Sequence, residues 1–401
     1  MSEILLIRRL LAGRPLQNLL AVIVMAVSVA LAIGMLLMSA GLHGSLVQAG
    51  KNFPMIMGAK GSPNQLVLNS VFLKDQPIGN FSYAKVLELR KNRNVEQAIP
   101  LGFGDNYRGF RLVGTEKEIF SFHGIEKGSN NWLQLSEGKI FEQPFEAVIG
   151  AETAAKTGLK IGDTFASVHG VTATANSKSH SEKYKVVGIL KPVQGPYDSA
   201  VFVSMESIWH QHNHSSINKT QDKTQQEVTS VLIRPSGYAQ SMQLAAQYSK
   251  DRDVQIIFPS KTIIELFSVI GNIEKVMQIF TAAVLLMALL IIGSSLYWFV
   301  VGSAYEQGIM RSLGATAKQI MYLYFKLGIT LVSIGTLLGL VLGHGVFQFV
   351  SYLLQEKVGL YMQVGFIPEE AVLLAAVFVF GAVCSIIPAY LSGRKDIVES
   401  L

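Results

Sequence analysis

The stretch NLLAVIVMAVSVALAIGMLLMSAGL (18–42) has no charged residue and is long enough to cross a bilayer as one helix. A bilayer core about 30 Å thick requires roughly 20 apolar residues, at a rise of about 1.5 Å each. Three more such stretches lie near the C-terminus, and four together argue against buried helices of a soluble core. The expected spans are Asn18–Leu42, Val276–Val301, Leu327–Leu354 and Ala371–Leu391.

The first stretch could instead be a cleaved signal peptide. Its apolar run from Leu19 to Leu42 is broken only by Ser28 and Ser39. That run is much longer than the apolar region of a signal peptide, which spans about 7–15 residues. We therefore predict a retained helix.

Basic residues near the spans set the orientation. Lys and Arg concentrate in cytoplasmic loops, and the short segment between the third and fourth spans carries only Lys357. Both termini and the loop 302–326 are therefore predicted to be cytoplasmic. This bias largely explains the net charge of +6, which does not indicate nucleic-acid binding. The basic residues are Arg8, Arg9, Arg14, Arg311, Lys318, Lys326, Arg394 and Lys395.

The spans divide the chain into one helix, a large outer region and three more helices. The segment EILLIRRLLAG (3–13) has an apolar face beside two arginines, which favours an interfacial helix over a frayed basic end. The predicted order is an interfacial cytoplasmic helix (1–16), a span (17–42), an extracytoplasmic domain (43–271), a span (272–301), a cytoplasmic loop (302–326), a span (327–354), an outer loop (355–370), a span (371–391) and a cytoplasmic tail (392–401).

The outer region alternates helical and strand patterns, so the predicted fold is an α-helical membrane protein with a mixed α/β extracytoplasmic domain. Gln65–Ser70 alternates like a strand. We predict an α/β body at about 43–143 and 228–265 with a β-rich insertion at about 144–227. The single cysteine, Cys384, lies in the fourth span, so no intrachain disulfide can form.

Two cytoplasmic segments carry a specific pattern. These are AYEQGIMRSLGATAKQIMYLYFKLG (304–328) and PAYLSGRKDIVESL (388–401). They resemble the MacB/FtsX-like (LolC/LolE-like) permeases of ABC transporters, whose loop after the second span reads approximately E-x-G-x-x-[RK]-x-[LI]-G-A. The outer segments 146–165 and 184–208 resemble the outer domain of that family in the same order.

The resemblance implies a mechanism. Such permeases form half of a transmembrane dimer, with a second copy or a paralogue, in a Gram-negative-type inner membrane. Each binds a cytoplasmic ATPase, whose motion reaches an outer domain that acts on lipoproteins, peptides or toxic compounds. This chain has no GxxxxGK[ST] phosphate loop, so ATP and Mg²⁺ are expected on the partner and no catalytic residue is expected here.

The loop after the second span is the predicted coupling element. A short helix ended by glycine can dock in a groove of a partner, with apolar side chains and an arginine in contact. The alternative is an ordinary cytoplasmic turn that has no role in coupling. The predicted coupling residues are Glu306, Gly308, Ile309, Met310, Arg311, Leu313 and Gly314.

The third span contains Gly335, Gly339 and Gly343 at intervals of four, a spacing that permits close helix packing. Their neighbour could be the second permease or a helix of the same chain, and we slightly favour the dimer interface. His344 is the titratable group expected within the membrane, and it could serve function or simply reach water.

Histidines gather in the outer region. His210, His212 and His214 alternate in HQHNH, and His169 and His180 precede them. In an extended strand, alternate imidazoles share a face and could bind Zn²⁺ or Cu²⁺. The alternative is a solvated, histidine-rich loop that binds no metal. No cysteine is available as a ligand, and we expect no acidic ligand close to these histidines before Asp222.

These histidines define one rival function, a metal-linked ABC system. A second rival is an FtsX-like regulatory module, which would activate a periplasmic partner without transport. A membrane enzyme is disfavoured, because the outer segment has no Gly-x-Ser-x-Gly, no His-Glu-x-x-His and no cysteine nucleophile.

Overall fold

The computed structural model describes residues 3–122, 132–170, 179–212, 223–358, 361–362 and 364–394. The chain divides into two compact units, which we describe separately. The membrane unit consists of Met1–Leu42, Ile270–Leu353 and Met362–Leu401, and the outer unit consists of His43–Val269 and Leu354–Tyr361.

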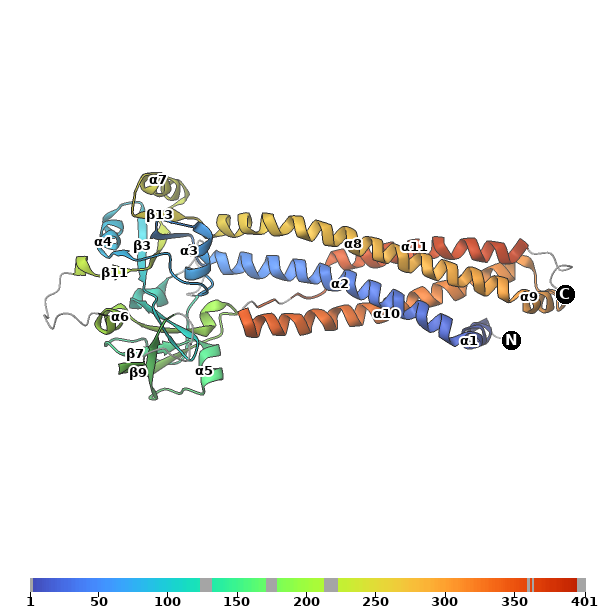
Figure 1. Ribbon diagram of the computed structural model, residues 1–401, viewed down its shortest axis with the longest axis horizontal. Coiled ribbons are helices and arrows are strands. Elements are labelled where there is room, and N and C mark those ends of the chain that lie inside the picture. Colours follow the sequence, from blue (N-terminus) through green and yellow to red (C-terminus); the bar gives the residue numbers. More distant parts are fainter. Residues whose placement is uncertain are drawn as a thin grey trace. The chain divides into compact units, whose positions relative to one another are not determined.

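The membrane unit is helical (Figure 1). Among the described residues, four stretches are long and apolar enough to cross a membrane, at Pro15–Ser45, Lys275–Gly302, Ala317–Gln355 and Pro368–Leu391. The predicted arrangement of one helix, a mixed α/β domain and three helices is therefore confirmed. The helices are α1 (Glu3–Gly13), α2 (Pro15–Lys51), α8 (Pro259–Gly302), α9 (Ala304–Ser312), α10 (Ala317–Val358) and α11 (Pro368–Arg394).

The glycines of α10 face α2 of the same chain. A Cβ built on Gly339 would lie 2.6 Å from Cβ of Val29, and one built on Gly335 would lie 2.7 Å from Cβ of Met25. Gly343 meets Ile33 one turn further along. The preference for a dimer interface at these glycines was wrong, because α2 occupies the space that the missing side chains leave.

The outer unit contains a four-stranded antiparallel sheet in the order β13-β1-β12-β3. Apolar residues of α4 (Ala84–Lys91) and α7 (Tyr238–Tyr248) pack with one face of this sheet into a core that includes Val86, Leu244 and Val231. The strands are β1 (Met55–Ala59), β3 (Val95–Leu101), β12 (Ser230–Pro235) and β13 (Val254–Ile257), and a separate small pair is β2 (Phe81–Ser82) with β11 (Glu227–Val228).

The stretch predicted as a strand at Gln65–Ser70 is helix α3 (Pro63–Ser70). Pro63 occupies the first turn, and the Ser62 hydroxyl accepts a hydrogen bond from Gln65 N. Both are helix-start signals that the alternation pattern obscured. The helix packs on β1 at Gly58, which leaves room for Leu66.

The second sheet has seven strands in the order β6-β9-β7-β10-β5-β4-β8, and β8 also pairs with β9. The sheet therefore closes on itself. Because β4 and β5 belong to it, this β-rich lobe begins near residue 105, whereas the prediction began it at 144. The strands are β4 (Asp105–Tyr107), β5 (Phe110–Thr115), β6 (Leu135–Gly138), β7 (Glu146–Ile149), β8 (Thr164–His169), β9 (Ser179–Leu190) and β10 (Ala200–Ser204), with helices α5 (Ala151–Thr157) and α6 (Met205–His212).

Candidate metal centre and coupling helix

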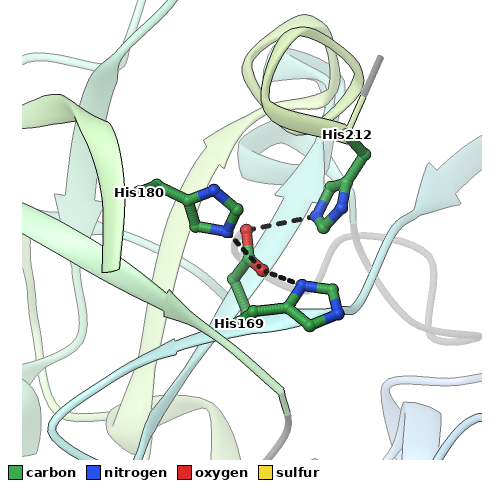
Figure 2. A group of neighbouring side chains, drawn as sticks. His169, His180 and His212 are labelled. Carbon is green, nitrogen blue, oxygen red and sulfur yellow. Dashed lines mark hydrogen bonds and ion pairs between the residues drawn. The ribbon is translucent and has the colours of Figure 1, made fainter. Parts of the chain in front are cut away.

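Three imidazoles surround one carboxylate in the outer unit (Figure 2). Asp105 Oδ1 lies 3.4 Å from His169 Nδ1 and 3.2 Å from His180 Nε2. Asp105 Oδ2 lies 3.3 Å from His212 Nε2. The four potential ligand atoms all lie within 4.8 Å of one another. We call Asp105, His169, His180 and His212 the histidine cluster.

Strand register brings these side chains together. Asp105 on β4 is directly opposite His169 on β8. Val168 pairs with Ser179, so His180 enters on β9 close to the end of β8. His212 is the last residue of α6. The cluster therefore combines three strands and one helix that are far apart in the sequence.

Two local features fix the ends of these elements. Arg108 and Gly109 both have positive φ, as a tight two-residue hairpin requires, and their turn follows β4 directly. Beside His212, the buried Gln211 accepts hydrogen bonds from Ser167 Oγ at 3.2 Å and Tyr184 OH at 3.1 Å. Gln211 thus ties the end of α6 to β8 and β9.

The cluster has a buried base and a more exposed rim. Asp105 is fully buried, whereas the His169 side chain is 63% exposed. Burial raises the pKa of Asp105, but the contacts with His212 and His180 outweigh it, so the pKa lies below its ordinary value. The contact with Asp105 raises the pKa of His212, against the smaller effect of its own burial.

The cluster corrects the sequence prediction. His210 lies in α6, and residues two apart on a helix do not share a face, so it is exposed outside the cluster. His214 lies outside the described residues. Asp105 was missed, because a lone aspartate distant from the histidines gives no signal until β4 and β8 are paired.

The spacing of the cluster suits a tetrahedral ion. Zn²⁺ binds imidazole nitrogen and carboxylate oxygen at about 2.0–2.2 Å, which sets tetrahedral ligands about 3.3–3.6 Å apart. The distances from Asp105 to its histidines are 3.2 and 3.4 Å from Oδ1 and 3.3 Å from Oδ2, and all four potential ligand atoms lie within 4.8 Å of one another, so rotation of the side chains would complete a tetrahedral arrangement. These four residues could therefore hold a metal ion without large movements of the backbone.

In the membrane unit, α9 is bounded by defined caps at its C-terminal side. Gly314 has φ of 96°, and its N–H bonds to Arg311 O while Ala315 N–H bonds to Met310 O. This pair of bonds is a Schellman motif. Thr316 and Gln319 then exchange side-chain and backbone hydrogen bonds, a capping box that begins α10.

The other side of α9 is fixed by a buried glutamine. Gln307 Nε2 donates to Val300 O at 2.8 Å and to Tyr324 OH at 3.3 Å, which joins α9 to the end of α8 and the start of α10. Gly308 is buried as well, whereas Glu306 is exposed and Met310 and Arg311 are partly exposed.

The described residues leave an apolar stripe exposed on α9 and its C-cap residue Leu313. Tyr305, Ile309 and Leu313 recur every four residues and are 65%, 39% and 82% exposed. They lie between the apolar stretches that end at Gly302 and begin at Ala317. Exposed apolar residues at helical spacing outside a span are typical of a helix that docks on a partner.

His344 has a partner that the sequence analysis missed. Its Nε2 lies 2.8 Å from Glu370 Oε2, and Glu370 Oε1 accepts a hydrogen bond from Ile367 N at 3.0 Å. Glu370 is fully buried in the first turn of α11. The prediction assigned it to an outer loop, because a charged residue ends an apolar pattern.

Comparisons with known proteins agree with this architecture. The MacB-like periplasmic core domain model matches residues 18–250, and the FtsX-like permease C-terminal model matches residues 278–397. No curated protein matches the chain.

Two solved structures show a distant likeness. The extracellular domain of the noncanonic ABC-type transporter YknZ from Gram-positive bacteria is 12% identical, with a TM-score of 0.32, over 51% of this chain and 98% of that one. The periplasmic region of MacB from Actinobacillus actinomycetemcomitans is 11% identical, with a TM-score of 0.34, over 54% and 94%. On the two family models, which match residues 18–250 and 278–397, this chain belongs to the MacB/FtsX-like permeases of ABC transporters.

Proposed function

We propose that this chain is a permease subunit that transmits the motion of a cytoplasmic ATPase to its outer domain. Permeases of this family work with ABC ATPase partners in the membrane. The observation that carries the proposal is the apolar stripe on α9, made by Tyr305, Ile309 and Leu313. In this arrangement the stripe seats in a groove of the ATPase, and Arg311 adds a charged hydrogen bond.

The helices provide a route for the motion. Gln307 links α9 to α8 and α10, so a displacement of α9 is passed to both. The helices α2 (Pro15–Lys51) and α8 (Pro259–Gly302) each extend along the chain beyond their membrane spans, which end at Ser45 and begin at Lys275. A continuous helix transmits displacement along its axis because its backbone hydrogen bonds are internal. The subunit would work as a dimer in the bacterial inner membrane, with the outer domain in the periplasm and both termini in the cytoplasm.

The test is substitution of Leu313 by aspartate. Leu313 is mostly exposed, so Leu313→Asp should leave the fold intact and reduce ATPase subunit recovered with the tagged permease at least tenfold. Ser312→Asp is the matched control, since it adds the same charge one residue away, off the stripe. Equal recovery of the ATPase with Leu313→Asp and the native chain would refute docking through this stripe.

A metal-linked ABC system is a second candidate, and the histidine cluster favours it over a purely regulatory module. The cargo would then be zinc or a molecule that carries zinc. Transport of zinc into or out of vesicles that contain the permease and its ATPase would distinguish this from action on lipoproteins, peptides or toxic compounds.

A further inference from the structure

We propose that Asp105, His169, His180 and His212 form a site for one exchangeable Zn²⁺ ion in the outer unit. The site depends only on the described residues of this lobe, so it stands whether or not the chain couples to an ATPase. Three imidazoles and one carboxylate are ligands that zinc accepts readily.

The first argument is the excess of imidazole around one carboxylate. A buried carboxylate that serves only structure is usually satisfied by a cation or by several backbone N–H groups. Asp105 Oδ2 is buried and has no hydrogen bond of good geometry among the described residues, although His212 Nε2 lies 3.3 Å away. A metal ion bound between these atoms would satisfy that oxygen.

The second argument is convergence of the rings. The ring centroids lie 5.2 Å apart for His169 and His212, 5.6 Å for His180 and His212, and 6.0 Å for His169 and His180. Each ring presents a nitrogen toward the same carboxylate (Figure 2). Three rings that only shared a solvated surface would have no reason to converge on one buried point.

The third argument is access. His169 is mostly exposed, and His212 is partly exposed, while Asp105 and His180 form the covered side. An ion can therefore enter and leave from the solvent through the His169 side. Structural zinc sites are commonly closed, so this arrangement favours exchange over permanent binding.

Binding would also affect the protein. Because its ligands come from β4, β8, β9 and α6, one ion would join the end of α6 to the β8–β9 pair. Gln211 already makes a weaker connection at the same place through Ser167 and Tyr184. Zinc should therefore slow amide hydrogen exchange in the last turn of α6 and in the start of β9.

The experiment uses the full chain in detergent, stripped with a chelator and titrated with zinc against a chromophoric competitor. The native chain should bind one ion, and X-ray absorption should show nitrogen and oxygen neighbours at about 2.0–2.2 Å. His180→Ala and His212→Ala should each weaken binding at least tenfold, since loss of even an outer partner of a ligand costs about 10–100-fold.

His210→Ala is the matched control, because His210 lies on α6 two residues from His212 and outside the cluster. It should bind zinc like the native chain. Asp105→Asn preserves the shape of the side chain and should also weaken binding, which protects the test if an alanine variant misfolds. The proposal is overturned if the native chain binds no zinc, or if the His180→Ala and His212→Ala chains bind it as tightly as the His210→Ala chain.

Discussion

In each unit a buried carboxylate contacts histidine, but the number of imidazoles around the carboxylate differs. In the membrane unit, Glu370 has one imidazole on one oxygen and a backbone N–H on the other. In the outer unit, Asp105 has three imidazoles around it, and among the described residues its Oδ2 has no hydrogen bond of good geometry. The first grouping is complete as it stands, and the second has the composition of a ligand set. Carboxylate burial alone therefore does not separate a structural pair from a binding site.

The largest loss of stability should come from removing Glu370 from its pair with His344. Glu370→Ala leaves the His344 imidazole and the Ile367 N–H without their acceptor. Removing the buried acceptor of these hydrogen bonds should cost about 1–3 kcal/mol of unfolding free energy. Thermal unfolding can be followed with a thiol-reactive dye, because Cys384 in α11 is the single cysteine of the chain.

Glu369→Ala is the control, since Glu369 precedes Glu370 but is exposed. It should change stability by less than about 0.5 kcal/mol. A double variant with leucine at 344 and 370 should cost less than the two single changes combined, by about 1 kcal/mol or more. Strict additivity would show that the two side chains do not act as a pair.

A partly exposed ion pair in the outer unit should have a smaller effect on stability. Lys85 Nζ lies 2.8 Å from Asp251 Oδ2. The hydrogen bond from Lys85, followed by those from the backbone of Asp253 and Val254, lowers the pKa of Asp251 to about 2. Lys85→Gln should cost only about 0.5 kcal/mol, because solvent screens the pair.

The pH dependence of this pair has a definite sign. A carboxyl with a lowered pKa stabilises the fold above its ordinary pKa of 3.8 and loses that contribution as the pH falls through about 2. The difference in melting temperature between native and Lys85→Gln chains, measured by tryptophan fluorescence, should thus be constant near pH 5–7 and shrink below about pH 4. Lys91→Gln on the same helix should show no such change, and an equal pH response in both variants would contradict the assignment.

The smallest effect should come from the histidine cluster without metal. His169 is mostly exposed, so His169→Ala in chelator-treated protein should alter stability by less than about 0.5 kcal/mol. The same substitution should remove most of the rise in melting temperature that zinc gives the native chain. A loss above 1 kcal/mol without metal would instead make the cluster a structural network like the pair at Glu370.

The sequence alone predicted the membrane architecture, because apolar length is a strong local signal. It also predicted a short helix after the second span that ends at Gly314, while the coupling role of that helix stays a prediction. Prediction from the sequence failed where the pairing of distant segments decides which side chains come together. The alternation in HQHNH suggested a strand, but α6 extends to His212 and separates His210 from the cluster. Asp105 could be recognised only once β4 lay beside β8.

The partner of α10 was undecidable for a similar reason. Small residues at intervals of four indicate that another helix packs closely, but they do not identify that helix. The contacts of Gly335 with Met25 and of Gly339 with Val29 identify α2. Glu370 was wrongly predicted to lie in an outer loop, because its charge is typical of an exposed residue, whereas the fold buries it.

The closure of the second sheet has a consequence for the behaviour of this protein at high concentration. Strands at the margin of an open sheet present unpaired N–H and C=O groups, and these recruit strands from other molecules. Here β8 lies between β4 and β9, and the long strand β9 pairs with β6, β7 and β8. The strands that supply three of the four cluster residues are thus shielded from intermolecular strand addition.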